Sequence, residues 1–401
     1  MALDKFVELL SALGNADNNA RQQAEQMYQQ AKQSEPESLV LGLTAVLANS
    51  QVKESIRRHS GVLLRQLITP GAEKDFAYAK LSLQSKQQLA TELLRMFEQE
   101  TLPKVKGNMG DAISKLAEYV CNPEDPRGSL SPGSHGAAGW PALLPTLFRL
   151  ANASDAAASV EGCDAALRLL LDVLPTLKAD IVAAQQDLAR LLQASLEHAD
   201  IRLRCAAVLL VCGLVQYTDQ GGWSSLLPTA PVMTQVVRQL AEAGKEESLD
   251  ETLQALTDVV TWQPDFFKPQ LSQGMEPANL MATLAKSKDN LPNGTRNLAL
   301  EWLVSMFEKR EKWLSKNVPQ FLPILIETCM NFLLEVDSEE EEVKAWAARM
   351  DDEEGDEDED ELMHTGEQAV DRVAAAGELE VLGPPLFQLI VHFTSQESWQ
   401  A

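Results

Sequence analysis

Apolar residues recur every three or four positions along almost the whole of this 401-residue chain. That period is typical of amphipathic α-helices, and the alternating runs of half-buried strands are nearly absent. Pro, Gly or Asn interrupts the pattern at short intervals, so the expected helices come in pairs. The pairs are residues 4–14 and 18–34, 36–49 and 53–68, 85–100 and 106–121, 140–152 and 160–177, 183–198 and 200–217, 231–244 and 247–262, 277–287 and 293–311, and 318–336 and 365–383.

The spacing of these pairs indicates a repeat array. Equivalent positions in the second helices lie 36, 53, 52, 40, 48, 46 and 71 residues apart. Most of these distances are near the period of about 40–47 residues expected of HEAT or armadillo units. One pair cannot bury its apolar face, whereas stacked pairs cover one another. We therefore expect an all-α fold, a right-handed superhelical solenoid of about eight antiparallel HEAT pairs. Because the pattern of a new helix begins at the end of the chain, without a polar capping repeat, we expect the array to be truncated there.

Two long interruptions divide the expected array. Residues 122–140 are rich in Pro, Gly and Ser and are predicted to form a loop. The last repeat distance is too long by about the size of an acidic block, so this block is an insertion between the two helices of the eighth pair. The expected organisation is repeats 1–3 in residues 1–121, the loop 122–140, repeats 4–7 and the first helix of repeat 8 in 141–334, the acidic insertion 335–364, and the second helix of repeat 8 with the start of repeat 9 in 365–401.

The acidic insertion carries more than half of the net charge. Residues 335–361 hold 16 acidic side chains against Lys344 and Arg349, which gives −14 of the total of −25. Composition leaves three interpretations open: a solvated, self-repelling spacer, a cation-binding loop, or a docking surface for a basic partner. A calcium loop of the EF-hand type with Gly355 at its sixth position would need Asp where Met350 stands, which disfavours that interpretation.

The remaining composition excludes several classes of protein. An acidic chain with a pI of about 4.6 is a poor binder of nucleic acid, because phosphate contacts need clustered Lys and Arg. The longest apolar run, residues 205–215, is too short to span a membrane. The five cysteines are scattered and include no CxxC pair, which indicates buried reduced thiols and no structural zinc.

Nothing in the sequence indicates catalysis. Phosphate-binding, dinucleotide-binding, zinc-protease and serine-hydrolase motifs are all absent. The five histidines lie in separate repeats, with no partner at metal-ligand spacing. We therefore expect a protein that is not an enzyme and that holds no cofactor and no metal.

Several arginines stand at or near the start of a predicted second helix. An arginine at this position pairs more often with a carboxylate or carbonyl of a neighbouring repeat than with a ligand. We therefore expect them to tie one repeat to the next: Arg57, Arg58, Arg65, Arg202, Arg204 and Arg296.

The chain resembles the importin-beta (karyopherin-beta) family of nuclear transport receptors, and within it the karyopherin beta-3 branch. "NNARQQAEQMYQQ", "SIRRHSGVLLRQLI" and "NGTRNLALEWLVSMFEKRE" are similar to the family's first, second and seventh inner helices. The most specific likeness is the eighth repeat, with its acidic loop, an internal Trp and the following "GEQAVDR" helix. Full-length members are more than twice as long, so the resemblance suggests an amino-terminal portion.

The resemblance implies partners and a location. Members of this family carry cargo with basic nuclear localisation signals, contact Phe-Gly nucleoporins, release cargo to Ran-GTP, and shuttle between cytoplasm and nucleus. Most of the cargo surface would lie in later repeats, and neither nucleic acid nor membrane insertion is implied. A generic HEAT-repeat scaffold is the alternative that the repeat pattern alone leaves open.

The resemblance also implies two sets of Ran-binding residues. The acidic-loop set is Asp351, Asp352, Glu353, Glu354, Asp356, Glu357, Asp358, Glu359 and Asp360. The inner-helix set is Arg21, Arg57, Asp111, Glu118 and Asp164.

Overall fold

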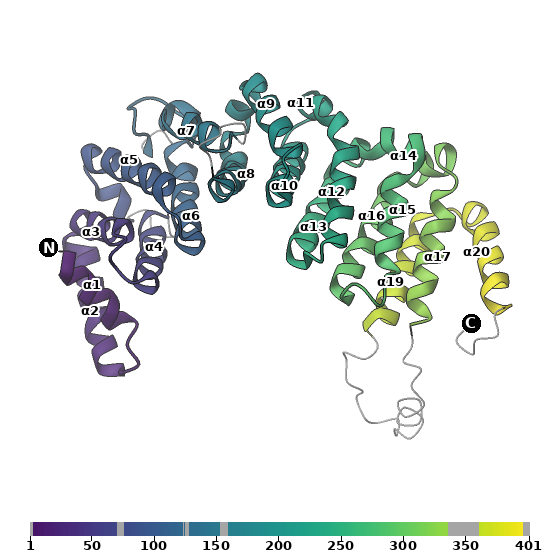
Figure 1. The fold of residues 1–401 in the computed structure, drawn as a ribbon, viewed down its shortest axis with the longest axis horizontal. Coiled ribbons are helices and arrows are strands. Elements are labelled where there is room, and N and C mark those ends of the chain that lie inside the picture. The colour runs from purple at the N-terminus through teal and green to yellow at the C-terminus, as the bar shows by residue number, and fades with distance from the viewer. Residues whose placement is uncertain are drawn as a thin grey trace. The chain divides into compact units, whose positions relative to one another are not determined.

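The predicted all-α fold is confirmed, as a solenoid of paired helices of the HEAT type. The computed structural model describes residues 3–69, 76–122, 124, 128–152, 159–335 and 361–395. Within these ranges every regular element is helical (Figure 1). The chain divides into two compact units, Met1–Leu210 and Val211–Ala401.

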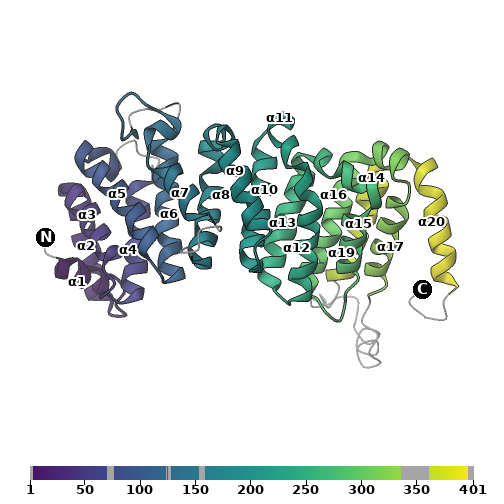
Figure 2. The same ribbon diagram turned by 45° about the horizontal axis from the view of Figure 1, so that its top comes forward.

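In the first unit, consecutive helices pack as pairs. Short 3₁₀ helices lie at η1 (Ala77–Lys80) and η3 (Gly136–Gly139). The long helices are α1 (Leu3–Leu13) with α2 (Asn18–Ser34), α3 (Pro36–Ala48) with α4 (Glu54–Ile68), α5 (Leu83–Gln99) with α6 (Pro103–Val120), α7 (Leu143–Leu150) with α8 (Val160–Ala183), and α9 (Gln185–Leu196), which precedes α10 (Ile201–Tyr217). The first helices form one layer, α1 to α3 to α5 to α7, and α4, α6 and α8 pack in succession in the other (Figure 2).

The second unit repeats this plan. Its short elements are α11 (Gln220–Trp223), η4 (Ser224–Thr229), η5 (Pro264–Phe267) and α14 (Lys268–Gly274). Its pairs are α12 (Ala230–Glu242) with α13 (Glu246–Trp262), α15 (Glu276–Ala285) with α16 (Asn293–Asn317), and α17 (Phe321–Leu333) with α19 (Glu361–Ala376), followed by α20 (Leu379–Thr394). Helices α13, α16 and α19 pack in succession, as do α12, α15, α17 and α20.

Side chains at the turns explain where helices begin. The Asp17 carboxylate accepts a hydrogen bond from the Asn19 amide at the start of α2. The hydroxyls of Ser82 and Ser159 cap α5 and α8 in the same way. Each cap satisfies an amide that the first helical turn leaves unpaired. Proline opens α3 and α6, where it has no amide hydrogen to lose.

Arginines tie neighbouring pairs together, as expected from their positions. Arg65 of α4 donates to Asp111 of α6 at 2.9 Å, and Arg202 of α10 donates to Glu161 of α8 at 3.1 Å. These bonds join second helices of successive repeats. The prediction that such arginines lock repeat to repeat is confirmed for these two residues.

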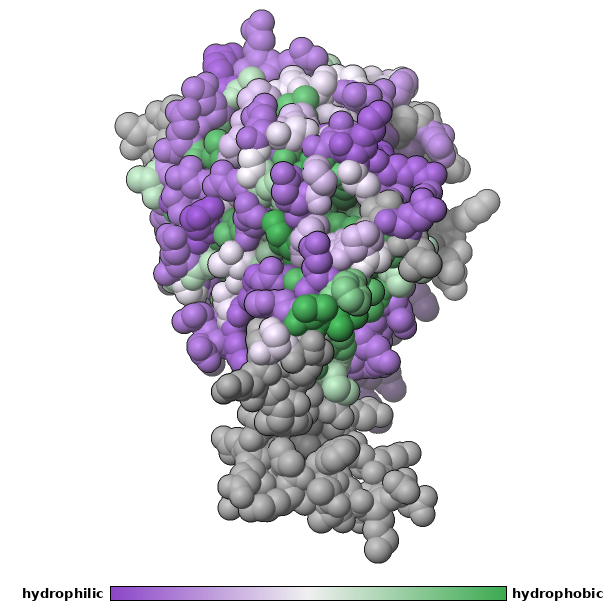
Figure 3. Space-filling model, turned by 90° about the vertical axis from the view of Figure 1, so that its right-hand side faces the viewer, coloured by the Kyte–Doolittle hydropathy of each residue, from purple (hydrophilic) through white to green (hydrophobic). Residues whose placement is uncertain are grey.

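The face of α20 that the described residues leave uncovered is apolar. Phe387 is 68% exposed and Val391 is 51% exposed. Figure 3, which looks onto the α20 side of the molecule, shows apolar side chains gathered on an otherwise largely hydrophilic face. Among the helices that the structure describes, none combines the length and apolar character needed to cross a bilayer.

Candidate partner-binding surface

The acidic insertion, called the acidic segment below, joins two helices, α17 and α19, that pack against each other. It therefore connects the two members of one helix pair. All nine carboxylates predicted to contact Ran in this segment lie outside the described residues: Asp351, Asp352, Glu353, Glu354, Asp356, Glu357, Asp358, Glu359 and Asp360. The disfavoured calcium loop also falls there, apart from Glu361 at the start of α19. In the described part of the chain, no cluster of His, Cys, Asp or Glu could hold a metal ion.

Arg296 fixes the point at which the chain enters the acidic segment. Its side chain is fully buried, and its guanidinium donates to Glu335, the first residue of the segment, with one bond of 2.8 Å. Its Nε also donates to the Ala285 carbonyl at the end of α15, at 2.9 Å. The guanidinium lies 5.1 Å from the centre of the Phe332 ring. Arg296 thus holds α15, α16 and the end of α17 together, which confirms that it pairs between repeats.

Arg372 fixes the other end of the segment. From α19 it forms four hydrogen bonds with two carboxylates of α16, to Glu301 at 2.6 and 2.9 Å and to Glu308 at 2.9 and 2.8 Å. The hydrogen bonds to Glu308, followed in size of effect by those to Glu301, raise the pKa of the Arg372 guanidinium above its usual range. Such bidentate arginine–carboxylate pairs define orientation as well as distance. The helix that leaves the acidic segment is therefore oriented against α16.

Gly366 allows α19 to approach α17 closely. A Cβ at this position would lie 2.9 Å from the Cβ of Phe332 and 3.0 Å from the Leu333 amide nitrogen. Carbon atoms in contact normally stay about 3.5–4.0 Å apart. Only glycine fits this approach without a shift of one helix.

The structure distributes the five predicted inner-helix residues among three settings. Arg21 on α2 is exposed, donates to Asn18 at 2.8 Å and lies 3.7 Å from Glu25. Glu118 on α6 is also exposed and accepts from Lys115 at 2.5 Å. These partners lie within the same helix, so both residues face solvent.

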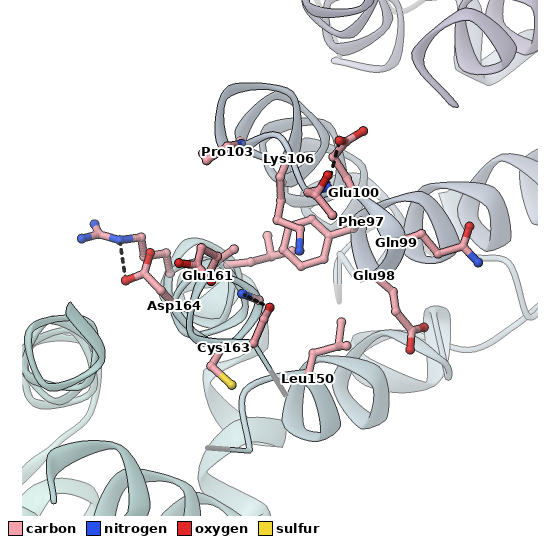
Figure 4. A pocket seen from close by; sticks show the side chains of 18 of the residues that line it. Phe97, Glu98, Gln99, Glu100, Pro103, Lys106, Leu150, Glu161, Cys163 and Asp164 are labelled. Atoms are coloured by element: carbon pink, nitrogen blue, oxygen red, sulfur yellow. Dashed lines mark hydrogen bonds and ion pairs between the residues drawn. The ribbon is translucent and has the colours of Figure 1, made fainter. Parts of the chain in front are cut away.

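Asp111 of α6 and Asp164 of α8 meet at one hollow. Asp111 accepts from Arg65, and Asp164 accepts from Arg168 at 3.4 Å. Both carboxylates line a cavity of about 830 Å³ formed by the end of α5, the helices α6 and α8, and Arg149 and Arg202 (Figure 4).

Charges of both signs line this hollow, with two more acidic than basic side chains. Six side chains are acidic: Glu98, Glu100, Asp111, Glu161, Asp164 and Asp172. Four are basic: Lys106, Arg149, Arg168 and Arg202. A hollow lined by this many charged groups suits the side chains of a protein partner better than an apolar small molecule.

The burial of Arg57 corrects the prediction that it contacts Ran from the surface of an inner helix. Its side chain is 3% exposed, its Nε donates to the Leu47 carbonyl at 2.9 Å, and its guanidinium pairs with Glu100. Leu47 belongs to the same repeat as Arg57 and Glu100 to the next one, so the alternative expectation, that an arginine here ties repeats together, is confirmed. A buried and fully engaged guanidinium is not available to a partner.

Three charged residues of these sites are absent from the sets predicted from the sequence. Lys106 occupies the first turn of α6 beside buried Val105, and Arg372 lies between Val370 and buried Val373. A charged residue next to core positions was the available signal in both cases. Arg149, which pairs with Glu98, gave no signal, because its partner is 51 residues away.

Two family models match the chain. One, described as "IPO5-like, TPR repeats", matches residues 131–276, and the other, described as "Importin repeat", matches residues 288–382. Together these matches cover more than half of the chain. The chain belongs to the importin-beta family.

Relatives extend the similarity to nearly the whole chain. Importin subunit beta-3 of Saccharomyces cerevisiae is 23% identical over 407 residues, which cover 98% of this chain and 34% of the yeast protein. A crystal structure of Kap121p is similar at a TM-score of 0.79 and 22% identity over 99% of this chain and 35% of that chain. A crystal structure of Kap121p bound to RanGTP is similar at a TM-score of 0.77 and 21% identity, with the same coverage. This importin-beta chain therefore spans about a third of the length of these relatives, and the structural likeness establishes the shared fold.

Proposed function

We propose that this chain is the Ran-GTP-binding part of a nuclear import receptor. Members of the importin-beta family are transport receptors rather than enzymes. The observation that carries the proposal is the similarity of 99% of this chain to Kap121p in its complex with RanGTP. The acidic insertion between α17 and α19 is the feature of this chain that a generic repeat scaffold does not require.

The acidic segment is proposed as the main electrostatic contact. A charge of −14 within residues 335–361 creates a strong negative field that attracts a basic protein surface. Single exposed ion pairs contribute at most about 1 kcal/mol, so the residues 351–360 would act together as a field. Arg296 and Arg372 hold the described residues at the two ends of the segment against α16 and its neighbours.

Exposed residues of the second helices are proposed as additional contacts. Arg21, Asp111, Glu118 and Asp164 carry charged groups at or near the surface, and their ion pairs are exposed enough to exchange partners. Arg57 is not included, because it is buried in the pair with Glu100.

Nucleoporins and cargo complete the proposal. Kap121p has been crystallised with Nup53p and with Pho4p, in structures that cover 99% of this chain. By analogy, this chain would contact Phe-Gly nucleoporins and the start of a cargo-binding surface, with most of the cargo contact made by later repeats. Homologues in this family shuttle between cytoplasm and nucleus, and we propose the same for this chain.

The second candidate function is a HEAT-repeat scaffold, in which the acidic segment is a solvated spacer. The two functions differ in their dependence on nucleotide. We would titrate the 401-residue chain with Ran loaded with a non-hydrolysable GTP analogue or with GDP. Binding of the GTP form at least about 100-fold tighter, a difference of about 2.7 kcal/mol, is expected of a receptor. Equal affinity for both forms, or no binding, would favour the scaffold.

A further inference from the structure

Lys106 is a buried cation that the described residues leave without a counterion in contact. Its side chain extends from the first turn of α6 across the ring of Phe97, with Nζ 5.3 Å from the ring centre (Figure 4). The residue is only 7% exposed, and it lines the hollow between α6 and α8. Among the described residues, no hydrogen-bond acceptor or carboxylate is within bonding distance of Nζ. Burying an ammonium group is costly unless it is paired.

The neighbouring carboxylates already have arginine partners. Glu98 accepts two hydrogen bonds from Arg149, at 2.8 and 3.0 Å. Glu100 pairs with Arg57, and Glu161 accepts from Arg202 at 3.1 Å. These three acids act on Lys106 through their field and not through contact. Lys106 is therefore the basic group of this hollow that is left to meet a ligand.

The start of α8 adds a second attraction for an anion. A Cβ on Gly162 would lie 4.0 Å from Nζ of Lys106, so the first turn of this 24-residue helix faces the ammonium group. The amide ends of a helix carry a partial positive charge, which favours an anion. Residue 162 is glycine, and the side chain beside this space is Ser159, whose hydroxyl would lie 2.9 Å from that Cβ and caps the helix start.

From this arrangement we infer that the hollow is a subsite for one carboxylate side chain of a protein partner, held between Nζ of Lys106 and the first turn of α8. The bound carboxylate would supply a counterion in contact with Nζ, which the described residues do not provide. Burial lowers the pKa of Lys106, and the fields of Glu100, Glu161 and Glu98 oppose this effect. A single negative charge fits here better than a phosphate dianion, because the same three carboxylates would repel the second charge.

A small probe tests this subsite without any protein partner. The full chain, labelled with ¹³C at lysine Cε, would be titrated with N-acetyl-glutamate amide, and the Lys106 signal would be identified by its loss in Lys106→Met. We expect a saturable shift of that signal in the millimolar range and a rise in the Lys106 pKa. Neutral N-acetyl-glutamine amide should leave it unchanged. Lys115, an exposed lysine of the same helix, provides the internal control and should show no saturable shift.

Two outcomes would overturn the inference. A Lys106 signal that does not respond to the glutamate probe would exclude an anion subsite. A stronger response to inorganic phosphate than to the carboxylate would exclude the assigned ligand. If Lys106→Met changes the circular dichroism of the chain, Lys106→Gln replaces it for the signal assignment. Since no GTPase is present, either failure leaves the proposed function untouched.

Discussion

Arg57 and Glu100 form an ion pair between neighbouring repeats in which both side chains are more than nine-tenths buried. Arg57 also donates to the Leu47 carbonyl in the last turn of α3, and Glu100 directly follows α5. Arg296 and Glu335 reproduce this arrangement in the second unit, again with a bond to a carbonyl in the last turn of the preceding first helix. An arginine at the start of a second helix thus joins two first helices in both units.

Removing one member of this pair should destabilise the first unit strongly. In Arg57→Met, the Glu100 carboxylate stays buried without its cation, and breaking a buried pair costs about 3–5 kcal/mol. The free energy of unfolding, from urea titration, measures this loss. The double variant Arg57→Met/Glu100→Leu should recover part of it, because no unpaired charge remains. A double variant less stable than either single variant would contradict this account of the pair.

Acid should remove the stabilisation that Asp200 provides. Hydrogen bonds from Arg202 lower the pKa of the Asp200 carboxyl from its ordinary 3.8 to about 2. A lowered pKa in the folded state stabilises the fold above pH 4, and this contribution is lost as the pH falls toward 2. We expect Asp200→Asn to cost about 1 kcal/mol at pH 7, since solvent screens the partly exposed pair. Urea titrations should show that the difference in the free energy of unfolding between the wild type and Asp200→Asn is smaller at pH 3 than at pH 7. A difference that does not depend on pH would refute the lowered pKa of Asp200.

Gly366→Ala should separate α19 from α17. The added methyl group would lie 2.9 Å from the Cβ of Phe332, and overpacking of this kind costs roughly 1–3 kcal/mol. Amide hydrogen exchange in α19 should accelerate. Gly294→Ala is the matched control, because a Cβ there meets nothing within 4 Å. Unchanged exchange rates in α19 of Gly366→Ala would show that the close approach is not required.

Arg372→Met should loosen the far end of the acidic segment. The variant loses four hydrogen bonds to Glu301 and Glu308 and leaves two α16 carboxylates facing each other. Hydrogen exchange in α19 should accelerate, and the proposed Ran-GTP binding should weaken about tenfold, which corresponds to about 1.4 kcal/mol. Arg95→Met, which removes only an exposed pair within α5, should change neither measurement. If Arg372→Met kept the full affinity for Ran-GTP, the hydrogen bonds of Arg372 would not contribute to partner binding.

Sequence periodicity was sufficient for the helix pairs, because each helix presents a continuous apolar stripe to its neighbours. The position of the acidic insertion followed from the one repeat distance that was too long. The distinction between Arg57 and Arg58 could not be predicted, since adjacent helical residues differ by about 100° in direction and the decisive partner, Glu100, lies 43 residues away. The Lys106 subsite depends on three helices that converge only in the folded chain.

The acidic segment is proposed to attract the GTPase through its negative charge. The most direct test is the association rate of Ran-GTP with the wild-type chain and with a variant whose nine acidic residues in 351–360 are replaced by Asn or Gln. We expect an association rate at least about tenfold lower in the variant at low salt, and a wild-type rate that falls as salt rises. A control with Glu246→Gln and Glu247→Gln, in the first turn of α13, should keep the wild-type rate. Equal rates for the wild type and the nine-residue variant would contradict the claim.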